Sequence, residues 1–435
     1  MSCSKTRKIS SRVNPHNKIR GLYRFYGLAL SFLILWCSSC VEIAQPYDKI
    51  PPGIWRAELT LTKDHVLPFN FEARYEEDKL KIDVLNGEER IPVEDIFFGK
   101  TKDLRDTLVM SFPLMDSYIS ATYRENILDG TWYVNNRENY EIPFTANFGQ
   151  SHRFTTDREV PKLDLTGLWE ATFELETEDE YPAIGEFQQK GNMLTGTFRT
   201  ETGDYRYLQG SVQGDNFYLS AFDGSHAFLF KGKISADDLI VGTFVSGSHY
   251  ETNWLARPNP ASTLTDVYAL SQITTPDKSI SFSLPNQDGE LVTLDDPDYR
   301  DKAKLITIMG TWCPNCLDEA KFLIDFLDNH EGDDLEIIAL AFEKYRDNDR
   351  ALERIKTYKE RLDIPYDILH AGYYDKAEAT ESLGWIDKIR SYPTLLFVDR
   401  DNKVLKVHTG FNGPATSKYE EFVAEFDRSI AALVK

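Results

Sequence analysis

The stretch Lys304-Leu-Ile-Thr-Ile-Met-Gly-Thr-Trp-Cys-Pro-Asn-Cys316 decides the fold of the C-terminal part of the chain. The residues from Lys304 to Met309 are mostly aliphatic and predict a buried β-strand. After Cys316, apolar side chains recur at helical spacing as far as Asn329. We therefore expect a strand that runs directly into a helix, with Cys313 at the helix N-terminus. Pro314 then takes the first helical position, where its missing amide hydrogen costs no hydrogen bond.

The residues around this stretch alternate between strand and helix patterns. Strand patterns cover 280–284, 291–294, 335–342, 395–398 and 404–408, and a charged amphipathic helix covers 346–362. Asp288-Gly289 and Asp401-Asn402 predict the turns of two hairpins. Alternating strands and helices predict a mostly parallel or mixed sheet with helices on both faces. We expect an α/β domain over residues 276–435, preceded by a linker over 259–275.

The two cysteines of this domain are placed for redox chemistry. Unpaired amide groups and the helix macrodipole favour a thiolate at position 313. Cys316 lies one helical turn further on, near enough to close a disulfide but shielded by the helix. We expect Cys313 to be the exposed attacking nucleophile and Cys316 to be the resolving thiol.

Three other interpretations of the pair stay open. A structural zinc site needs four ligands, and His330, His370 and His408 are dispersed. A purely structural disulfide fits an oxidising compartment. A thiol peroxidase needs a threonine three residues before its reactive cysteine, where this chain has Gly310.

Together these residues resemble the thioredoxin superfamily, and specifically the extracytoplasmic TlpA/ResA-like thiol–disulfide oxidoreductases. The resemblance is carried by Phe282-x-Leu284, Asp288-Gly289, the segment from Gly310 to Cys316, Glu319 and Tyr392-Pro393-Thr394. It implies that Cys313 and Cys316 cycle between dithiol and disulfide without a metal or any further cofactor. It also implies that Pro393 is cis and holds the substrate backbone beside Cys313, with Trp312, Tyr392 and Thr394 contacting the substrate.

The sequence departs from the superfamily at the position of a buried acid, six residues before the first cysteine, where it has Thr307. The proton must then be handled elsewhere, and Glu319 matches an acidic position of the family. We expect Glu319 to be the catalytic acid, while a solvated helix face stays open as the alternative. Lys321 replaces a proline that often kinks this helix.

Residues 51 to about 260 read as short strands punctuated by turns. Hairpin-type turns are predicted at Asn86-Gly87, Asp129-Gly130, Gly214-Asp215 and Asp223-Gly224. Strand patterns cover 57–62, 79–84, 108–112, 217–222 and 227–231. We expect an all-β antiparallel architecture, barrel- or sandwich-like, ahead of the α/β domain.

An internal repeat divides this region. Gly53-Ile-Trp-Arg-Ala57 recurs as Gly167-Leu-Trp-Glu-Ala171, and Gly130-Thr-Trp132 recurs as Gly242-Thr-Phe244. We expect two β-rich repeats, over 51–155 and 160–258. The second resembles avidin-like and lipocalin-like barrels, with aromatic residues as core. A ligand-holding barrel mouth and a single large closed sheet stay open as alternatives, and His226 and His249 are not expected to be ligands.

The first forty residues predict an export signal. Residues 1–24 are basic, Gly27 to Trp36 is apolar, and Ser38-Ser39 precedes Cys40. This resembles a bacterial lipoprotein signal over 1–39, with a lipidated Cys40 and a tether over 40–50. Cys37 departs from the leucine usual three residues before the lipidated cysteine. An uncleaved anchor is the alternative.

The whole sequence therefore predicts a lipid-anchored thiol–disulfide oxidoreductase of the cell envelope, facing the periplasm or associated with the outer membrane. The net charge of −21 excludes a nucleic-acid surface. Family resemblance favours a protein disulfide reductase whose partners are envelope thiol proteins, a membrane electron donor and the bilayer. The alternatives are a partner-binding lipoprotein with an accessory redox domain, or a thiol peroxidase-like member of the superfamily. The direction of exchange, the client, the membrane face and the oligomeric state stay open.

Overall fold

The computed structural model describes residues 49–435 except 236, 276, 331 and 333. These residues belong to one compact unit, which spans Tyr47–Lys435. The predicted signal segment, the predicted lipidation site at Cys40 and the predicted tether up to residue 48 lie outside the described residues. At the end of the predicted tether, Ile50 is fully buried. Within the described part of the chain, no helix is long and apolar enough to span a membrane.

The first repeat forms an open antiparallel sheet. Its strand order is β4-β3-β2-β1-β9-β8-β7-β6-β5, and the outer strands β4 and β5 are not paired with each other. Its elements are β1 (Gly53–Thr60), β2 (Val66–Glu76), β3 (Lys79–Asn86), β4 (Glu89–Pro92), β5 (Asp95–Lys100), β6 (Asp106–Phe112), η1 (Pro113–Met115), β7 (Ser117–Arg124), β8 (Ile127–Val134) and β9 (Glu141–Phe148).

The second repeat closes into a barrel, because β11 pairs with β12 as well as with β10. Its strands are β10 (Gly167–Phe173), β11 (Tyr181–Lys190), β12 (Met193–Thr200), β13 (Gly203–Asp204), β14 (Leu208–Gln213), β15 (Asn216–Phe222), β16 (Ala227–Ile234), β17 (Ile240–Ser246) and β18 (Tyr250–Pro258). The two-residue β13 pairs only at the end of β12. Rings fill the barrel interior, among them Phe173, Phe198, Phe230 and Trp254. The interior is therefore a packed core.

The two repeats show the same local design. Trp55 and Trp169 each donate an indole hydrogen bond to the carbonyl four residues earlier, at 3.0 and 2.8 Å. The barrel contributes to the hydrophobic core of the open sheet. Its Phe222 ring lies 4.6 Å from the Phe69 ring and 5.0 Å from the Trp132 ring. The fold class is confirmed, whereas the alternative of one large closed sheet is wrong.

One predicted turn is wrong. Asp129-Gly130 lies inside β8 instead of ending a strand. A Cβ atom at position 130 would lie 2.1 Å from the Ser120 carbonyl oxygen of the neighbouring strand β7. Glycine is therefore required there by the close approach of two strands, and the turn preference of the dipeptide is overridden.

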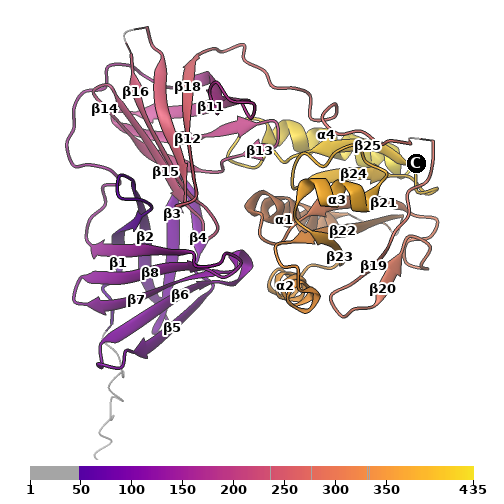
Figure 1. Ribbon diagram of the computed structural model, residues 1–435, viewed down its shortest axis with the longest axis horizontal. Coiled ribbons are helices and arrows are strands. Elements are labelled where there is room, and N and C mark those ends of the chain that lie inside the picture. The colour runs from indigo at the N-terminus through magenta and orange to yellow at the C-terminus, as the bar shows by residue number, and fades with distance from the viewer. Residues whose placement is uncertain (1–48, 236, 276, 331, 333) are drawn as a thin grey trace, which may run out of the picture. The chain divides into compact units, whose positions relative to one another are not determined.

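The C-terminal part is the predicted α/β domain (Figure 1). Its elements are β19 (Ser283–Pro285), β20 (Leu291–Thr293), β21 (Ala303–Met309), α1 (Pro314–Asn329), β22 (Leu335–Glu343), α2 (Asn348–Arg361), β23 (Asp367–Tyr373), α3 (Lys376–Leu383), β24 (Thr394–Val398), β25 (Val404–Thr409) and α4 (Tyr419–Leu433). The main sheet has the order β23-β22-β21-β24-β25. β21 and β22 are parallel, while β24 is antiparallel to β21. The fully buried central strand β21 delivers the cysteine pair to one edge of the sheet.

Candidate active site

Cys313 caps the N-terminus of α1, as the sequence predicts. Its backbone is extended, Pro314 begins the helix, and its Sγ accepts a hydrogen bond from the Cys316 amide at 3.3 Å. This amide and the aligned peptide dipoles of α1 favour negative charge on the sulfur. The turn between β21 and α1 therefore places the Cys313 sulfur at the helix N-terminus, next to the Cys316 amide.

The loop before β24 lies against the same sulfur. The Tyr392–Pro393 peptide bond is cis, as the family resemblance implies. The Cys313 thiol donates to the Tyr392 carbonyl oxygen at 3.3 Å. Thr394 begins β24 and is fully buried, and its hydroxyl donates to the Ser391 carbonyl at 2.9 Å. Residues separated by about eighty positions in sequence thus meet at Cys313.

Trp312 lies beside Cys313 and contacts the cis-proline loop. Its indole donates to the Phe342 carbonyl at 2.9 Å, and its ring lies 5.6 Å from the Tyr392 ring. A Cβ atom at position 310 would lie 2.3 Å from the Trp312 indole nitrogen, so only glycine fits there. The structure therefore brings Trp312, Tyr392 and Thr394 together around the cis-proline loop, although their substrate contacts remain predictions.

Cys313 is not exposed, which corrects one expectation. Only 7 % of its surface is accessible, although it lines a cavity of about 220 Å³. Thr202, Gly203 and Arg206 of the barrel line the same cavity, together with His226 and Phe228. The sequence could not reveal this cover, because these residues precede the cysteine by more than eighty positions.

Cys316 is the more deeply buried sulfur, with 2 % of its surface accessible. Burial raises the pKa of its thiol well above the ordinary value, and the nearby Cys313 and the charge of Glu319 raise it further. Cys316 is therefore held as a neutral thiol. It needs a proton acceptor before it can attack a disulfide.

Glu319 lies inside the domain, so the solvated-face alternative is wrong. Only 1 % of its surface is accessible, and one carboxyl oxygen accepts a hydrogen bond from the Thr307 hydroxyl at 2.5 Å. The other carboxyl oxygen has no partner among the described residues. Burial raises the pKa of Glu319 to about 7, against which the Thr307 hydrogen bond acts. Thr307, at the position of the superfamily's acid, thus hydrogen-bonds the buried carboxyl of Glu319.

Sequence patterns did not point to two residues at the end of β22, Glu343 and Lys344. Buried Glu343 accepts from the Thr311 amide at 2.9 Å and from its hydroxyl at 2.8 Å, which fixes the loop before Cys313. The Lys344 ammonium lies 4.5 Å from the Trp312 ring centre, and burial lowers its pKa to about 8. The sequence does place these two charged residues at the carboxyl end of a buried strand. Functional groups gather at that end of the strands in α/β sheets, so this position could have identified them.

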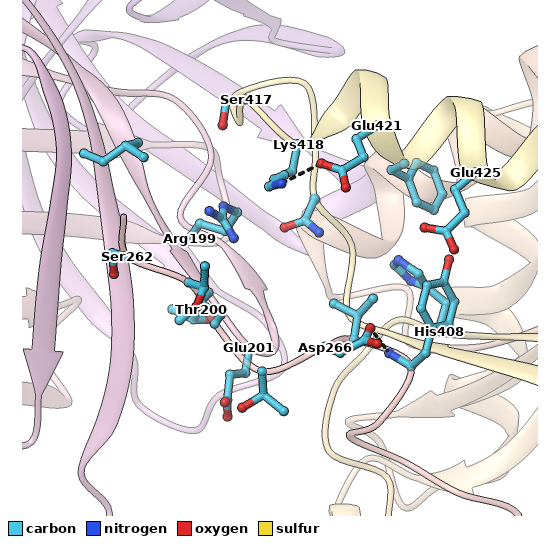
Figure 2. A pocket seen from close by; sticks show the side chains of 18 of the residues that line it. Arg199, Thr200, Glu201, Ser262, Asp266, His408, Ser417, Lys418, Glu421 and Glu425 are labelled. Atoms are coloured by element: carbon cyan, nitrogen blue, oxygen red, sulfur yellow. Dashed lines mark hydrogen bonds and ion pairs between the residues drawn. The ribbon is translucent and has the colours of Figure 1, made fainter. Parts of the chain in front are cut away.

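A larger cavity of about 550 Å³ lies elsewhere (Figure 2). It is lined by the end of β12, the segment after β18, β25 and the start of α4, including Arg199, Asp266, His408 and Glu421. The buried His408 donates its Nδ1–H to the Gly410 carbonyl at 3.0 Å, and burial lowers its pKa to about 4. No cysteine lines this cavity. In the described part of the chain, no group of three His, Cys, Asp or Glu residues could hold a metal ion.

Comparisons with known proteins found one family model and several solved structures that are similar to part of the chain. The Redoxin family model matches residues 274–423. No curated protein sequence matches the chain. A thioredoxin-family thiol:disulfide interchange protein from Chlorobium tepidum is 21% identical, covering 36% of this chain and 95% of its own, with a TM-score of 0.28. A thiol-disulfide oxidoreductase from Bacteroides fragilis is 20% identical, covering 34% of this chain and 99% of its own, with a TM-score of 0.25.

The match of the Redoxin model contains β21, the cysteine pair, the cis-proline loop and β25. The order of these elements, with a parallel β21–β22 pair and an antiparallel β24–β25 hairpin, is the thioredoxin-like arrangement that the sequence predicts. Residues 274–423 therefore match the Redoxin family model and have a thioredoxin-like fold.

Proposed function

We propose that this chain is a membrane-anchored, extracytoplasmic thiol–disulfide oxidoreductase that reduces protein disulfides through Cys313 and Cys316. The observation that carries the proposal is the placement of the Cys313 sulfur. It lies 3.3 Å from the Cys316 amide and 3.3 Å from the Tyr392 carbonyl, between a helix N-terminus and the cis-proline loop. A helix N-terminus favours ionisation of a thiol when it attacks, and the cis-proline loop offers a backbone against which a substrate strand can lie.

The reaction begins with the reduced pair. The Cys313 thiolate attacks one sulfur of the substrate disulfide, forming a mixed disulfide and releasing the other substrate sulfur as a thiolate that takes a proton. The Cys316 sulfur then attacks Cys313, closes the intramolecular disulfide and releases the second substrate thiol. The substrate gains two electrons and two protons, and the cysteine pair is oxidised. A dithiol electron donor at the membrane must restore the reduced pair.

Glu319 supplies the proton acceptor that the second step requires. A carboxyl with a pKa of about 7 is partly ionised near neutral pH, so it can accept the Cys316 proton and later return it. Its burial places the proton inside the domain, where the charge of Glu319 acts on the Cys316 thiol. The pathway needs no metal and no organic cofactor.

The envelope location rests on the N-terminal sequence. A basic segment, a short apolar run and Ser38-Ser39-Cys40 support export and lipidation. The partners would be thiol- or disulfide-containing proteins of the envelope. The anchor is tested by Cys40→Ala in cells. We expect the mature protein to leave the membrane fraction and to lose the mass of the lipid, and retention of both would contradict the anchor.

The redox activity is tested on the full chain with insulin as the substrate. Cys313→Ser should abolish insulin reduction, and undiminished reduction by this variant would refute the proposal. The reduction potential of the pair decides the direction of exchange. A potential near that of thioredoxin, about −270 mV, supports a reductase, whereas one near about −120 mV would reverse the direction to an oxidase.

A further inference from the structure

A segment of the barrel crosses the redox site. This barrel segment, residues 200–206, contains the end of β12 and the short strand β13. The Thr202 carbonyl accepts a hydrogen bond from the Ser391 hydroxyl, next to the cis-proline loop. The Asp204 carbonyl accepts from the Asn315 amide nitrogen at 3.2 Å, between the two cysteines. The segment therefore binds to both elements between which a substrate strand would lie.

Two charged side chains hold the barrel segment in this position. Arg206 is buried, donates to the Pro314 carbonyl at 3.0 Å and forms an ion pair with Asp318 of α1 at 2.7 Å. It also pairs with Glu89 of the first sheet. The Asp204 carboxylate accepts from the Gly413 amide at 2.8 Å. These contacts are charge-assisted, and those of Arg206 are buried, so they hold the segment more firmly than exposed pairs would.

The approach is too close to admit a polypeptide between the two surfaces. Gly203 has a φ of +135°, and a Cβ atom there would lie 2.4 Å from the Asn315 amide nitrogen. On the other side, a Cβ atom on Gly410 would lie 2.9 Å from the Thr202 backbone. The cavity left at Cys313 is about 220 Å³, which is below the roughly 300–1,000 Å³ of pockets that enclose drug-sized ligands.

We propose that the barrel segment is a specificity-determining gate that selects disulfides by size. A small disulfide reaches Cys313 through the cavity, whereas a protein disulfide reaches it only after the segment has moved away. Space for this movement exists, because Thr200 and Glu201 also line the 550 Å³ cavity (Figure 2). This inference deepens the proposed function, on which its statement about substrates rests.

The gate is tested by the size dependence of cysteine alkylation, which requires no turnover. The reduced full chain is treated with iodoacetamide or with a maleimide attached to a long polyethylene glycol, and peptide mapping follows the modification of Cys313. Gly203→Ala displaces the Asn315 side-chain amide and so removes its hydrogen bond to the Asp204 carbonyl, one of the contacts that hold the segment closed. Gly167→Ala is the matched control, because Gly167 has a similar φ of +124° and no atom within 4 Å of the added Cβ.

We expect iodoacetamide to modify Cys313 of the wild type and the large maleimide to react only slowly. In Gly203→Ala the ratio of the large-reagent rate to the small-reagent rate should rise by about tenfold or more, since strain shifts the population toward the open state. Gly167→Ala should keep the wild-type ratio. Asp204→Asn, which weakens the contact to Gly413, should raise the ratio as well and serves if Gly203→Ala does not fold.

The inference is overturned if the folded Gly203→Ala and Asp204→Asn variants both keep the wild-type ratio. It is also overturned if the ratio of the large-reagent rate to the iodoacetamide rate at Cys313 is the same in the folded wild type as in the unfolded chain. Turnover of insulin and of hydroxyethyl disulfide is measured in parallel. If neither disulfide is reduced, the proposed function fails, while the alkylation ratios still report on the gate.

Discussion

Replacing Glu319 with glutamine tests the buried carboxyl directly. Below its ordinary pKa of 4.5, the carboxyl is protonated in both the folded and the unfolded chain. Between pH 4.5 and about 7, the unfolded chain releases the proton while the folded chain keeps it. The bound proton therefore stabilises the folded chain fully below pH 4.5, and this stabilisation is lost as the pH rises toward 7.

The size of the effect follows from the same two pKa values. A difference of about 2.5 pKa units corresponds to roughly 3 kcal/mol, at about 1.4 kcal/mol for each unit. Glu319→Gln has no such proton, so its stability relative to the wild type should rise by about 3 kcal/mol across this pH window. Above pH 7 the difference should become constant.

Urea denaturation of the reduced chain at a series of pH values measures this difference. Tryptophan fluorescence and far-ultraviolet circular dichroism are recorded together, so that unfolding of the α/β domain can be separated from that of the barrel. Glu381→Gln is the matched control, because Glu381 is an exposed glutamate on α3 of the same domain. A stability difference between Glu319→Gln and the wild type that does not change with pH would refute the assignment of a buried proton.

Three further predictions concern the cysteine pair, a buried ion pair and a strand contact. Cys316→Ser should accumulate a mixed disulfide between Cys313 and the substrate, seen as a higher-mass species on non-reducing gels, and its absence during insulin turnover would contradict the resolving role of Cys316. Arg206→Met should destabilise the chain by about 3–5 kcal/mol in urea denaturation, because Glu89 and Asp318 lose their buried partner; a change below about 1 kcal/mol would show that these carboxylates are solvated. Gly130→Ala should lower stability by about 1–3 kcal/mol or more, since its Cβ would lie 2.1 Å from the Ser120 carbonyl; unchanged thermal unfolding would contradict the strand contact.

Much of the α/β domain could be predicted because its signals are local. The apolar run before Met309, the helical spacing after Cys316 and the proline at position 314 each concern residues within a few positions of one another. Hydrogen bonds and side-chain packing inside one strand or one helix follow from such patterns. The N-terminal cap formed by Cys313 and the start of α1 at Pro314 are therefore as predicted.

The β region shows where local patterns are insufficient. Both repeats contain the Gly-x-Trp-x-Ala segment, at Gly53 and at Gly167, yet only the second closes into a barrel. In the first, the interior is completed by barrel residues such as Phe222 and Leu229. Closure depends on which strand edges meet, and this is decided by packing between the repeats. The turn predicted at Asp129-Gly130 is wrong for a similar reason, because the neighbouring strand overrides the turn preference of this dipeptide.

The sequence by itself determined that two cysteines stand at the start of a helix, that a proline loop follows far downstream and that the carboxyl three residues beyond Cys316 is Glu319. Only the tertiary structure decided that this carboxyl is buried beside Thr307, and that the barrel segment covers Cys313. The physical reason is that burial and access depend on every surface that packs against a residue. For Cys313 that surface comes from a different domain, brought there by Arg206 and Asp204.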